Sequence, residues 1–264
     1  MKIKKRIVNS LFINLIGRLL YPYLLIYRKV HPYQGTVILL FHDVYLKNFE
    51  SIIKHLKKNY RIISFAEFKD YFLKGKNPPK NSIIITFDDG LKSVYKEAFP
   101  VILRENIPIM VYLISNSLEG KTMKYHSTET IHYLSLKDIK KMQKSGLVTF
   151  GSHTKSHRCL SNLSLKEREN EIRDSKYVIE KIIGEKIEDF SFPYGGFNTF
   201  SNEDLNILKK AGYKTAAINV GGINSKNTNL YLLRRVCICK NHNKYVIELF
   251  ISGLLHKLIG VWKD

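Results

Sequence analysis

Short apolar runs alternate with longer amphipathic stretches along the chain. The runs are rich in β-branched residues and are bounded by polar residues, Gly or Pro, a pattern that predicts buried strands. They lie at 36–44, 82–87, 107–114, 147–151, 189–192, 213–219 and 230–238. Helical periodicity occupies the stretches between them, at 46–75, from Gly90 to Glu105, and at 136–145, 164–183 and 202–211. Strands that alternate with helices predict an α/β chain of parallel βα units in one barrel-like domain.

Residues typical of helix ends support these boundaries. Ser64 is a plausible N-cap for the helix that follows it, and Ser164 stands three residues before Glu167, the spacing of a capping box. Gly146 and Gly184 are placed to end two of the predicted helices. The stretch 115–133 shows no periodicity and predicts a long loop, of the kind that often forms a lid.

Polar residues whose side chains can take part in catalysis or metal binding follow several of the predicted strands. They are His42 and Asp43, the pair Asp88 and Asp89, His153 with His157, and Pro193-Tyr194-Gly195. In a parallel barrel the carboxyl ends of the strands meet at one rim, where the βα loops carry the chemistry. We therefore expect these four groups to converge on one site.

The residue types in these groups point to metal-assisted hydrolysis. His153 and His157 are four residues apart, a spacing that lets both imidazoles bind one ion. With one Asp of the 88–89 pair they form a two-His, one-carboxylate set, which leaves positions open for water and substrate. The other Asp is then free to accept a proton from the water. The alternatives are a surface turn for Asp-Asp-Gly and a structural zinc site completed by Cys159.

The charge balance is strongly basic and bears on partners. The chain has 43 Lys and Arg against 23 Asp and Glu, a net charge of +20. Such a field attracts nucleic acid, anionic lipid or an acidic polymer, although a Lys-rich solvated surface explains it as well. No nucleic-acid module accompanies the charge, so nucleic acid is not an expected partner. The three cysteines are too few, and odd in number, for a disulfide framework.

The two ends of the chain differ from the middle. Residues 1–35 begin with a basic hexapeptide and continue as an apolar stretch interrupted by Arg18 and Pro22. This segment falls short of a clean membrane span and fits a helix lying on an anionic membrane surface, in the cell envelope. An ordinary helix packed on the barrel is the alternative, and the same two interpretations apply to the C-terminal apolar helix at 241–264. The expected organisation is therefore these two segments around a catalytic domain at 36–240.

Three motifs together resemble those of the polysaccharide deacetylases, carbohydrate esterase family four. They are Thr86-Phe-Asp-Asp-Gly90, Ser152-His-Thr-Lys-Ser-His157 and Phe192-Pro-Tyr-Gly195, and their order and spacing agree with the family across residues 36–240. The first two motifs form a specific pair, whereas Pro-Tyr-Gly alone is weak. The resemblance implies a distorted (β/α) barrel that removes N-acetyl groups from sugars.

The resemblance also implies roles for individual residues. Asp88 corresponds to the general base, and the divalent ion, for which zinc is favoured, is bound by Asp89, His153 and His157. The backbone N–H of Tyr194 corresponds to a donor that holds the oxyanion.

The chain departs from the family at two points. Ser191 stands where many members carry an Arg that positions the base, and Arg234 or Arg235 is a candidate replacement. No histidine matches the family's usual general acid, so His42 is the candidate acid, with His242 as the weaker choice.

The sequence thus predicts a metal-dependent deacetylase acting on an N-acetylated polysaccharide or glycolipid. Two rivals stay open: another metal amidohydrolase that cleaves a C–N bond of a small molecule, and a non-catalytic glycan-binding relative that keeps the metal.

Overall fold

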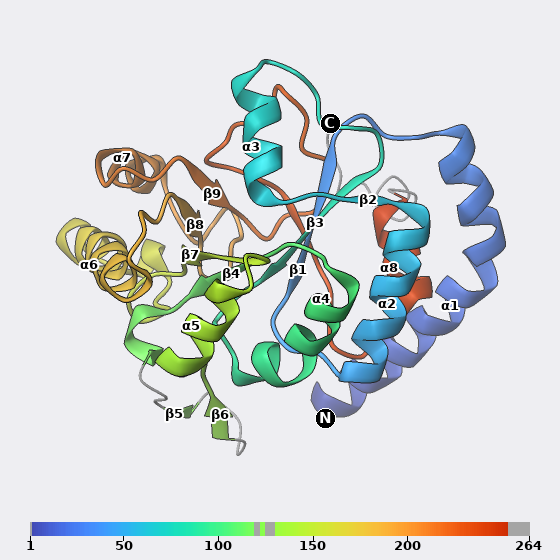
Figure 1. Ribbon diagram of the computed structural model, residues 1–264, viewed down its shortest axis with the longest axis horizontal. Helices are drawn as coiled ribbons and strands as arrows, with labels where there is room; N and C mark the ends of the chain where they lie inside the picture. The colour runs from blue at the N-terminus through green and yellow to red at the C-terminus, as the bar shows by residue number, and fades with distance from the viewer. Residues whose placement is uncertain (1, 119–121, 125–129, 253–264) are drawn as a thin grey trace.

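A computed structural model describes residues 2–118, 122–124 and 130–252 of the chain (Figure 1). Within these residues, eight parallel strands form one curved sheet in the order β10-β1-β3-β4-β7-β8-β9, with β2 paired to β3. The strands are β1 (Thr36–Phe41), β2 (Arg61–Ile62), β3 (Ser82–Phe87), β4 (Ile109–Leu113), β7 (Val148–Ser152), β8 (Asp189–Ser191), β9 (Thr215–Ala217) and β10 (Arg235–Cys237). A parallel bridge between Ala217 and Leu233 joins the two edges. The sheet is therefore a nearly closed barrel, as the sequence predicted.

The long strands are buried on both faces, which explains their continuous apolar sequences. Every residue of β1 and β3 is buried, as expected where helices cover the outside of a parallel sheet. Ile38 and Ile84 pack with Met110 in a cluster of their own, separate from the larger cluster under the helices. Phe68 belongs to the smaller cluster, so its helix α3 (Phe65–Leu73) covers this part of the barrel.

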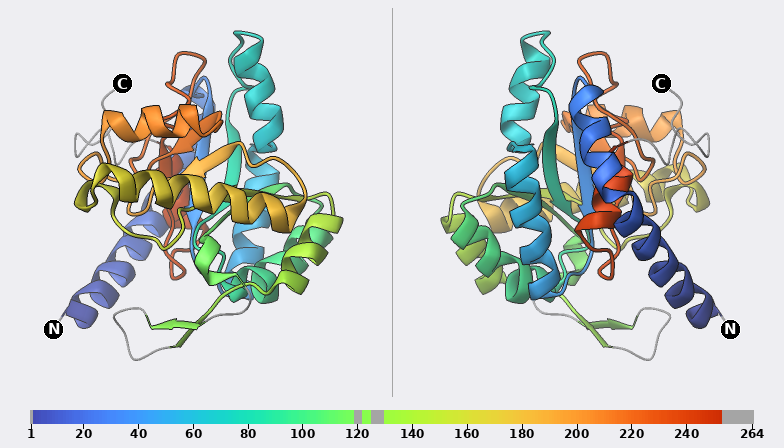
Figure 2. Two further views of the ribbon diagram at one scale, coloured as in Figure 1. Left: turned by 90° about the vertical axis from the view of Figure 1, so that its left-hand side faces the viewer. Right: turned by 90° about the vertical axis from the view of Figure 1, so that its right-hand side faces the viewer.

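The other helices wrap the sheet (Figures 1 and 2). They are α2 (Leu46–Asn59), α4 (Phe99–Glu105), α5 (Leu136–Lys144), α6 (Leu165–Ile183) and α7 (Asn202–Lys210). The predicted caps are confirmed: the Ser64 side chain accepts from the Glu67 amide, and Ser164 with Glu167 forms a capping box.

The two ends of the chain pack together on one side of the barrel. Helix α1 (Lys2–Val30) contacts α8 (Lys244–Ile251) so closely that a Cβ on Gly17 would lie 3.0 Å from the Tyr245 backbone. Leu24 of α1 is fully buried there. Within the described residues, no helix has the length and apolar character needed to cross a membrane. The second half of the C-terminal apolar segment, residues 253–264, lies outside the described residues.

Three details differ from the sequence-based expectation. The stretch 46–75 is not one helical region, because β2 separates α2 from α3. The predicted loop at 115–133 contains a short antiparallel pair, β5 (Thr122–Lys124) with β6 (Thr130–His132). The segment after Gly90 starts as a π-helical turn at Val94–Ala98 before α4.

Candidate active site

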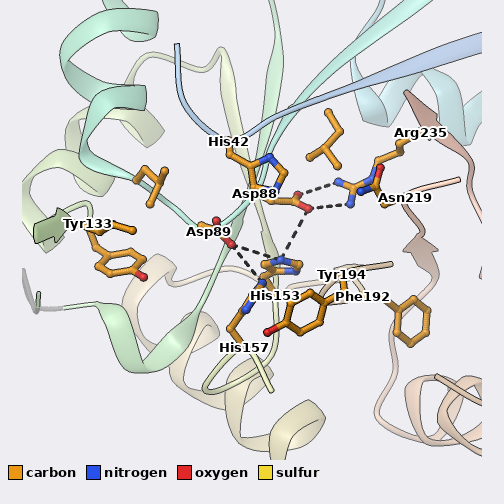
Figure 3. Close-up of a pocket in the computed structure, with 13 residues that line it drawn as sticks. His42, Asp88, Asp89, Tyr133, His153, His157, Phe192, Tyr194, Asn219 and Arg235 are labelled. Carbon is orange, nitrogen blue, oxygen red and sulfur yellow. Dashed lines mark hydrogen bonds and ion pairs between the residues drawn. The ribbon is translucent and has the colours of Figure 1, made fainter. Parts of the chain in front are cut away.

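The polar groups that follow four strands line one cavity at the carboxyl end of the barrel (Figure 3). Its volume is about 360 Å³. The residues around it come from both chain halves: Leu40, His42, Asp88, Asp89, Leu91, Ile131, Tyr133, His153, His157, Phe192, Tyr194, Asn219 and Arg235. The cavity thus brings together the six residues to which the sequence assigned roles: His42, Asp88, Asp89, His153, His157 and Tyr194. Asp43, which was expected beside His42, does not line it and pairs with Lys240.

Asp89, His153 and His157 form the group suited to a metal ion. The Asp89 Oδ1 atom lies 3.5 Å from Nε2 of each histidine, and the three ligand atoms lie within 4.8 Å of one another. Asp89 Oδ1 is buried, yet it has no hydrogen-bond partner among the described residues. A buried carboxylate oxygen without a partner is costly, so an ion held by these three side chains fits the site.

The surrounding backbone holds both histidines in place. Nδ1 of His153 is 2.8 Å from the Ser191 carbonyl oxygen, so this nitrogen donates and Nε2 is left to face Asp89. The amide of His157 donates to Oγ1 of Thr154 at 3.0 Å, which folds the loop between the two histidines. Burial, followed by the nearby His153, lowers the pKa of His157 to about 4. His157 is therefore neutral at physiological pH, as a metal ligand must be.

Several residues of the site have left-handed backbones. Asp89, Thr154, His157 and Tyr194 have φ angles of 68°, 64°, 59° and 65°. This conformation costs free energy for residues other than Gly and tends to occur at functional sites. At Asp89 it starts a left-handed turn, so Asp88 and Asp89 face different partners.

Asp88 is held by a fully buried arginine. The guanidinium of Arg235 donates to both carboxylate oxygens, Nη1 to Oδ1 and Nη2 to Oδ2, each at 2.7 Å. Ser191 Oγ is 3.0 Å from Asp88 Oδ2 and 2.8 Å from Arg235 Nη2. Burial is the largest single influence and raises the pKa of Asp88, but the charge and hydrogen bonds of Arg235 together with His153 and His42 outweigh it, so that pKa lies well below its usual range. Asp88 is therefore an ionised carboxylate facing His153, with Nε2 at 3.7 Å from Oδ2.

The loop that carries the histidines is anchored by a buried glutamate of α6. Glu171 Oε2 accepts from the amides of Lys155 and Ser156, at 3.0 and 2.9 Å. The Ser156 hydroxyl donates to the other oxygen. Glu171 is 5% exposed, so its charge is balanced chiefly by these loop donors. The histidine spacing was visible in the sequence, but this anchor was not.

Tyr194 and His42 lie on opposite sides of the cavity (Figure 3). Tyr194 is more than half exposed, and its ring centroid is 5.1 Å from that of His157. The turn after it requires glycine, because a Cβ on Gly195 would lie 2.4 Å from the Asn219 amide nitrogen. His42 follows β1 and lies beside Asp88, whose pKa it helps to lower.

Three other sequence candidates are placed differently. Arg234 and Arg235 were the two candidates for the arginine that positions Asp88. Arg235 contacts Asp88, whereas Arg234 donates to the Gly221 carbonyl outside the cavity. Cys159 is not in the ligand group; its sulfur lies 3.3 Å from Ser161 Oγ. His242 packs against the Phe250 ring and does not line the cavity. Asn219 and Tyr133 line it without having been expected to.

The chain forms a nearly closed parallel barrel. At the carboxyl rim of this barrel lie Asp88, a candidate general base, and a group of two histidines and one carboxylate. These features define a barrel hydrolase. Residues 75–216, more than half of the chain, match the family described as polysaccharide deacetylase. The chain belongs to this family, whose members are hydrolases that act on carbon–nitrogen bonds other than peptide bonds.

Individual relatives agree with this assignment. The Bacillus subtilis polysaccharide deacetylase-type protein YxkH is 27% identical over 209 residues, covering 79% of this chain and 70% of the relative. The Staphylococcus aureus poly-β-1,6-N-acetyl-D-glucosamine N-deacetylase is 29% identical over 220 residues, covering 78% and 71%. The solved structure of IcaB from Ammonifex degensii superposes with a TM-score of 0.72 at 22% identity, covering 83% of this chain and 98% of that one. The last comparison shows a shared fold.

Proposed function

We propose that this protein is a metal-dependent deacetylase that removes acetyl groups from the amino sugars of an N-acetylated glycan. The observation that carries the proposal is the pairing of two sites in one cavity. Ionised Asp88 lies beside the ligand group of Asp89, His153 and His157, so a base and an ion can act on one water molecule. Zinc is the ion we favour, because two imidazoles and a carboxylate with open positions form a common catalytic zinc set.

The bound ion would supply a Lewis acid that polarises the acetyl carbonyl and lowers the pKa of water. Asp88 then accepts the proton from the attacking water, while Arg235 and Ser191 keep its oxygens aimed into the cavity. The new C–O bond creates an oxyanion, to which the Tyr194 amide donates. When the C–N bond breaks, His42 gives the leaving nitrogen a proton. The products are acetate and a free amine on the sugar.

The proposed substrate is a polymer of β-linked N-acetylglucosamine, the substrate in the name of the S. aureus relative. Aromatic rings stack on the apolar faces of sugars, and Tyr194 at the cavity and Phe197 just after it are both more than half exposed. A glycolipid that carries an N-acetylated sugar is the alternative substrate. We expect the protein to act in the cell envelope.

The test is acetate release from poly-N-acetylglucosamine, with and without a chelator. The parent protein should release acetate, chelation should abolish release, and added zinc should restore it. Asp88→Asn should lower the rate by about 10²-fold or more, since general base catalysis supplies about 10²–10⁴-fold. Asp70→Asn makes the same change on a surface carboxylate of α3 that pairs with Lys74, and it should behave as the parent does.

The outcomes separate this proposal from its rivals. Acetate release from a small amide but from no glycan would favour a small-molecule amidohydrolase. Metal binding without acetate release from any substrate would favour a glycan-binding relative.

A further inference from the structure

Helix α1 carries a continuous apolar stripe on the surface of the molecule. Its members are large side chains, each more than half exposed: Phe12, Leu15, Leu19, Tyr23, Ile26 and Val30. They follow one another at intervals of three or four residues, so they share one face of the helix. At 1.5 Å per residue, the stripe is about 27 Å long.

This stripe faces away from the protein, because the opposite face of α1 packs inward. Leu24 is buried, and Arg28 forms a buried ion pair with Glu248 of α8. Figure 2 shows α1 on the outside of the barrel, with its N-terminal end projecting past the other elements. The exposed face therefore has no covering element among the described residues. A large apolar patch of this kind on a soluble domain marks an interaction surface.

Basic groups lie beside α1. Lys47, Lys54 and Lys58 share one face of α2 and, with Lys244, line a cavity of about 550 Å³. Tyr21 and Leu25 of α1 form another part of its wall, so this cavity lies along the flank of α1.

Acidic groups offset only part of this charge. Glu50 is the acidic residue that lines the cavity, and it already pairs with Lys54 and Arg104. Arg18 and Lys29 of α1 itself are exposed. The helix continues toward a chain end whose first six residues include four Lys and Arg.

We propose that α1 docks on an anionic lipid bilayer, with its stripe in the boundary between headgroups and acyl chains. An amphipathic helix with an apolar face and basic flanks lies in this plane and binds more tightly when the lipids are anionic. The lysines of α2 then approach the lipid phosphates, where each basic residue adds to binding. Burial of the stripe against a second copy is less favourable, because it would bring together two chains of charge +20.

Docking in this way leaves the catalytic cavity open. The stripe points away from the barrel, whereas the cavity lies at the carboxyl end of the strands. Figure 1 shows that α1 runs opposite to β1, so its N-terminal end lies toward the end of the barrel where β1 finishes. The docked protein therefore holds its cavity near the membrane surface without covering it.

The test is flotation of the full-length protein with vesicles. One set is phosphatidylcholine, and the other contains equal parts of phosphatidylcholine and phosphatidylglycerol. The parent protein should float with the anionic vesicles and much less with the neutral ones. The double variant Leu19→Ser, Ile26→Ser should lose at least tenfold in partition coefficient, because it removes two apolar side chains from the centre of the stripe.

The matched control is Leu73→Ser, Leu165→Ser, which removes two exposed leucines from α3 and α6. It should bind vesicles as the parent does. The triple variant Lys47→Gln, Lys54→Gln, Lys58→Gln should lower binding to the anionic vesicles by about fivefold per lysine. Melting temperatures equal to that of the parent would establish that each variant is folded.

Three results would overturn the proposal. The first is a parent protein that does not float with anionic vesicles. The second is a stripe variant that floats as well as the control. The third is a parent dimer that the stripe variant converts to a monomer, with no difference in vesicle binding. Vesicle flotation needs no catalysis, so these results are independent of the deacetylase proposal.

Discussion

Arg235 holds Asp88, the proposed general base, although the resemblance of the motifs led us to expect an arginine at position 191. Ser191 stands there, and its hydroxyl contacts both partners of the ion pair. Arg235 reaches the same carboxylate from β10, 147 residues along the chain. Its planar fork matches the two carboxylate oxygens, which a lysine ammonium cannot do. Asp88 is thus oriented by a pair of hydrogen bonds as well as by charge.

We therefore predict that Arg235→Lys lowers kcat about 10- to 100-fold with little change in KM. The positive charge remains, but Asp88 loses the paired hydrogen bonds that orient its two oxygens, and it turns away from the attacking water. Zinc affinity should stay within about threefold of the parent, because Arg235 contacts no ligand. Steady-state kinetics and a competitive zinc chelator measure both quantities. Arg234→Lys is the matched control, since the Arg234 guanidinium donates to the Gly221 carbonyl and does not line the cavity. Equal losses in the two variants would contradict a positioning role.

The unpartnered Asp89 oxygen leads to a second prediction at this scale. Zinc at about 100 times its dissociation constant should stabilise the protein by about 2.7 kcal/mol, seen as a higher melting temperature. Asp89→Asn removes one ligand charge and should abolish most of that shift. Asp88→Asn makes the same change one residue away and should retain the shift, although the variant itself melts lower. A full zinc shift in Asp89→Asn would exclude this site as the place of binding.

At the scale of elements, the sequence predicted what depends on local pattern. The strand at 82–87 was predicted residue for residue, because burial on both faces leaves a continuous apolar run. The two-residue strand β2 was missed, since it has too few residues for a pattern. The pair β5–β6 was read as a loop for the same reason.

The same distinction, between what local pattern predicts and what it does not, holds for the site. Asp88, Asp89, His153 and His157 were found because their spacing lies within short motifs. Glu171 could not be found in this way. Its helix reads as charged and solvated, and only tertiary packing turns Glu171 toward the histidine loop. From the sequence, the arginine that contacts Asp88 could be identified only as Arg234 or Arg235. Strand register decides which of the two faces the barrel interior.

The anchoring role of Glu171 leads to a prediction for α6. Glu171→Gln removes the negative charge to which the Lys155 and Ser156 amides donate, so the loop should hold His157 less firmly. We expect zinc affinity to fall about tenfold, the lower end of the range for groups that support metal ligands. Glu169→Gln makes the same change two residues earlier on the same helix and should leave zinc affinity unchanged. Calorimetric titration with zinc compares the two. An unchanged affinity in Glu171→Gln would mean that the loop holds its shape without this anchor.

At the scale of the molecule, the chain ends are tied to the barrel by one buried carboxylate. Glu248 of α8 is fully buried and accepts from Arg28 of α1 at 3.1 Å and from Tyr60 at 2.9 Å. Its other oxygen is 2.8 Å from His55 Nε2 on α2. Three elements distant in sequence therefore share one negative charge. The same helix α1 presents its apolar stripe to solvent, so this cluster determines how firmly that surface is attached to the enzyme.

We predict that Glu248→Leu loosens α1 before it disturbs the barrel. Loss of the carboxylate leaves the Arg28 charge buried without its anion, a change that costs about 3–5 kcal/mol of the free energy of unfolding. Denaturant unfolding measures that loss, and hydrogen exchange shows where it falls: amides at 21–30 should exchange much faster, whereas those of β3 and β4 change less. Glu169→Leu makes the same change on α6. It should alter neither the free energy of unfolding to this extent nor the hydrogen exchange of α1. Uniformly faster exchange would show instead that α1 and the barrel unfold as one unit, and that the cluster stabilises the whole molecule rather than the attachment of its N-terminal helix.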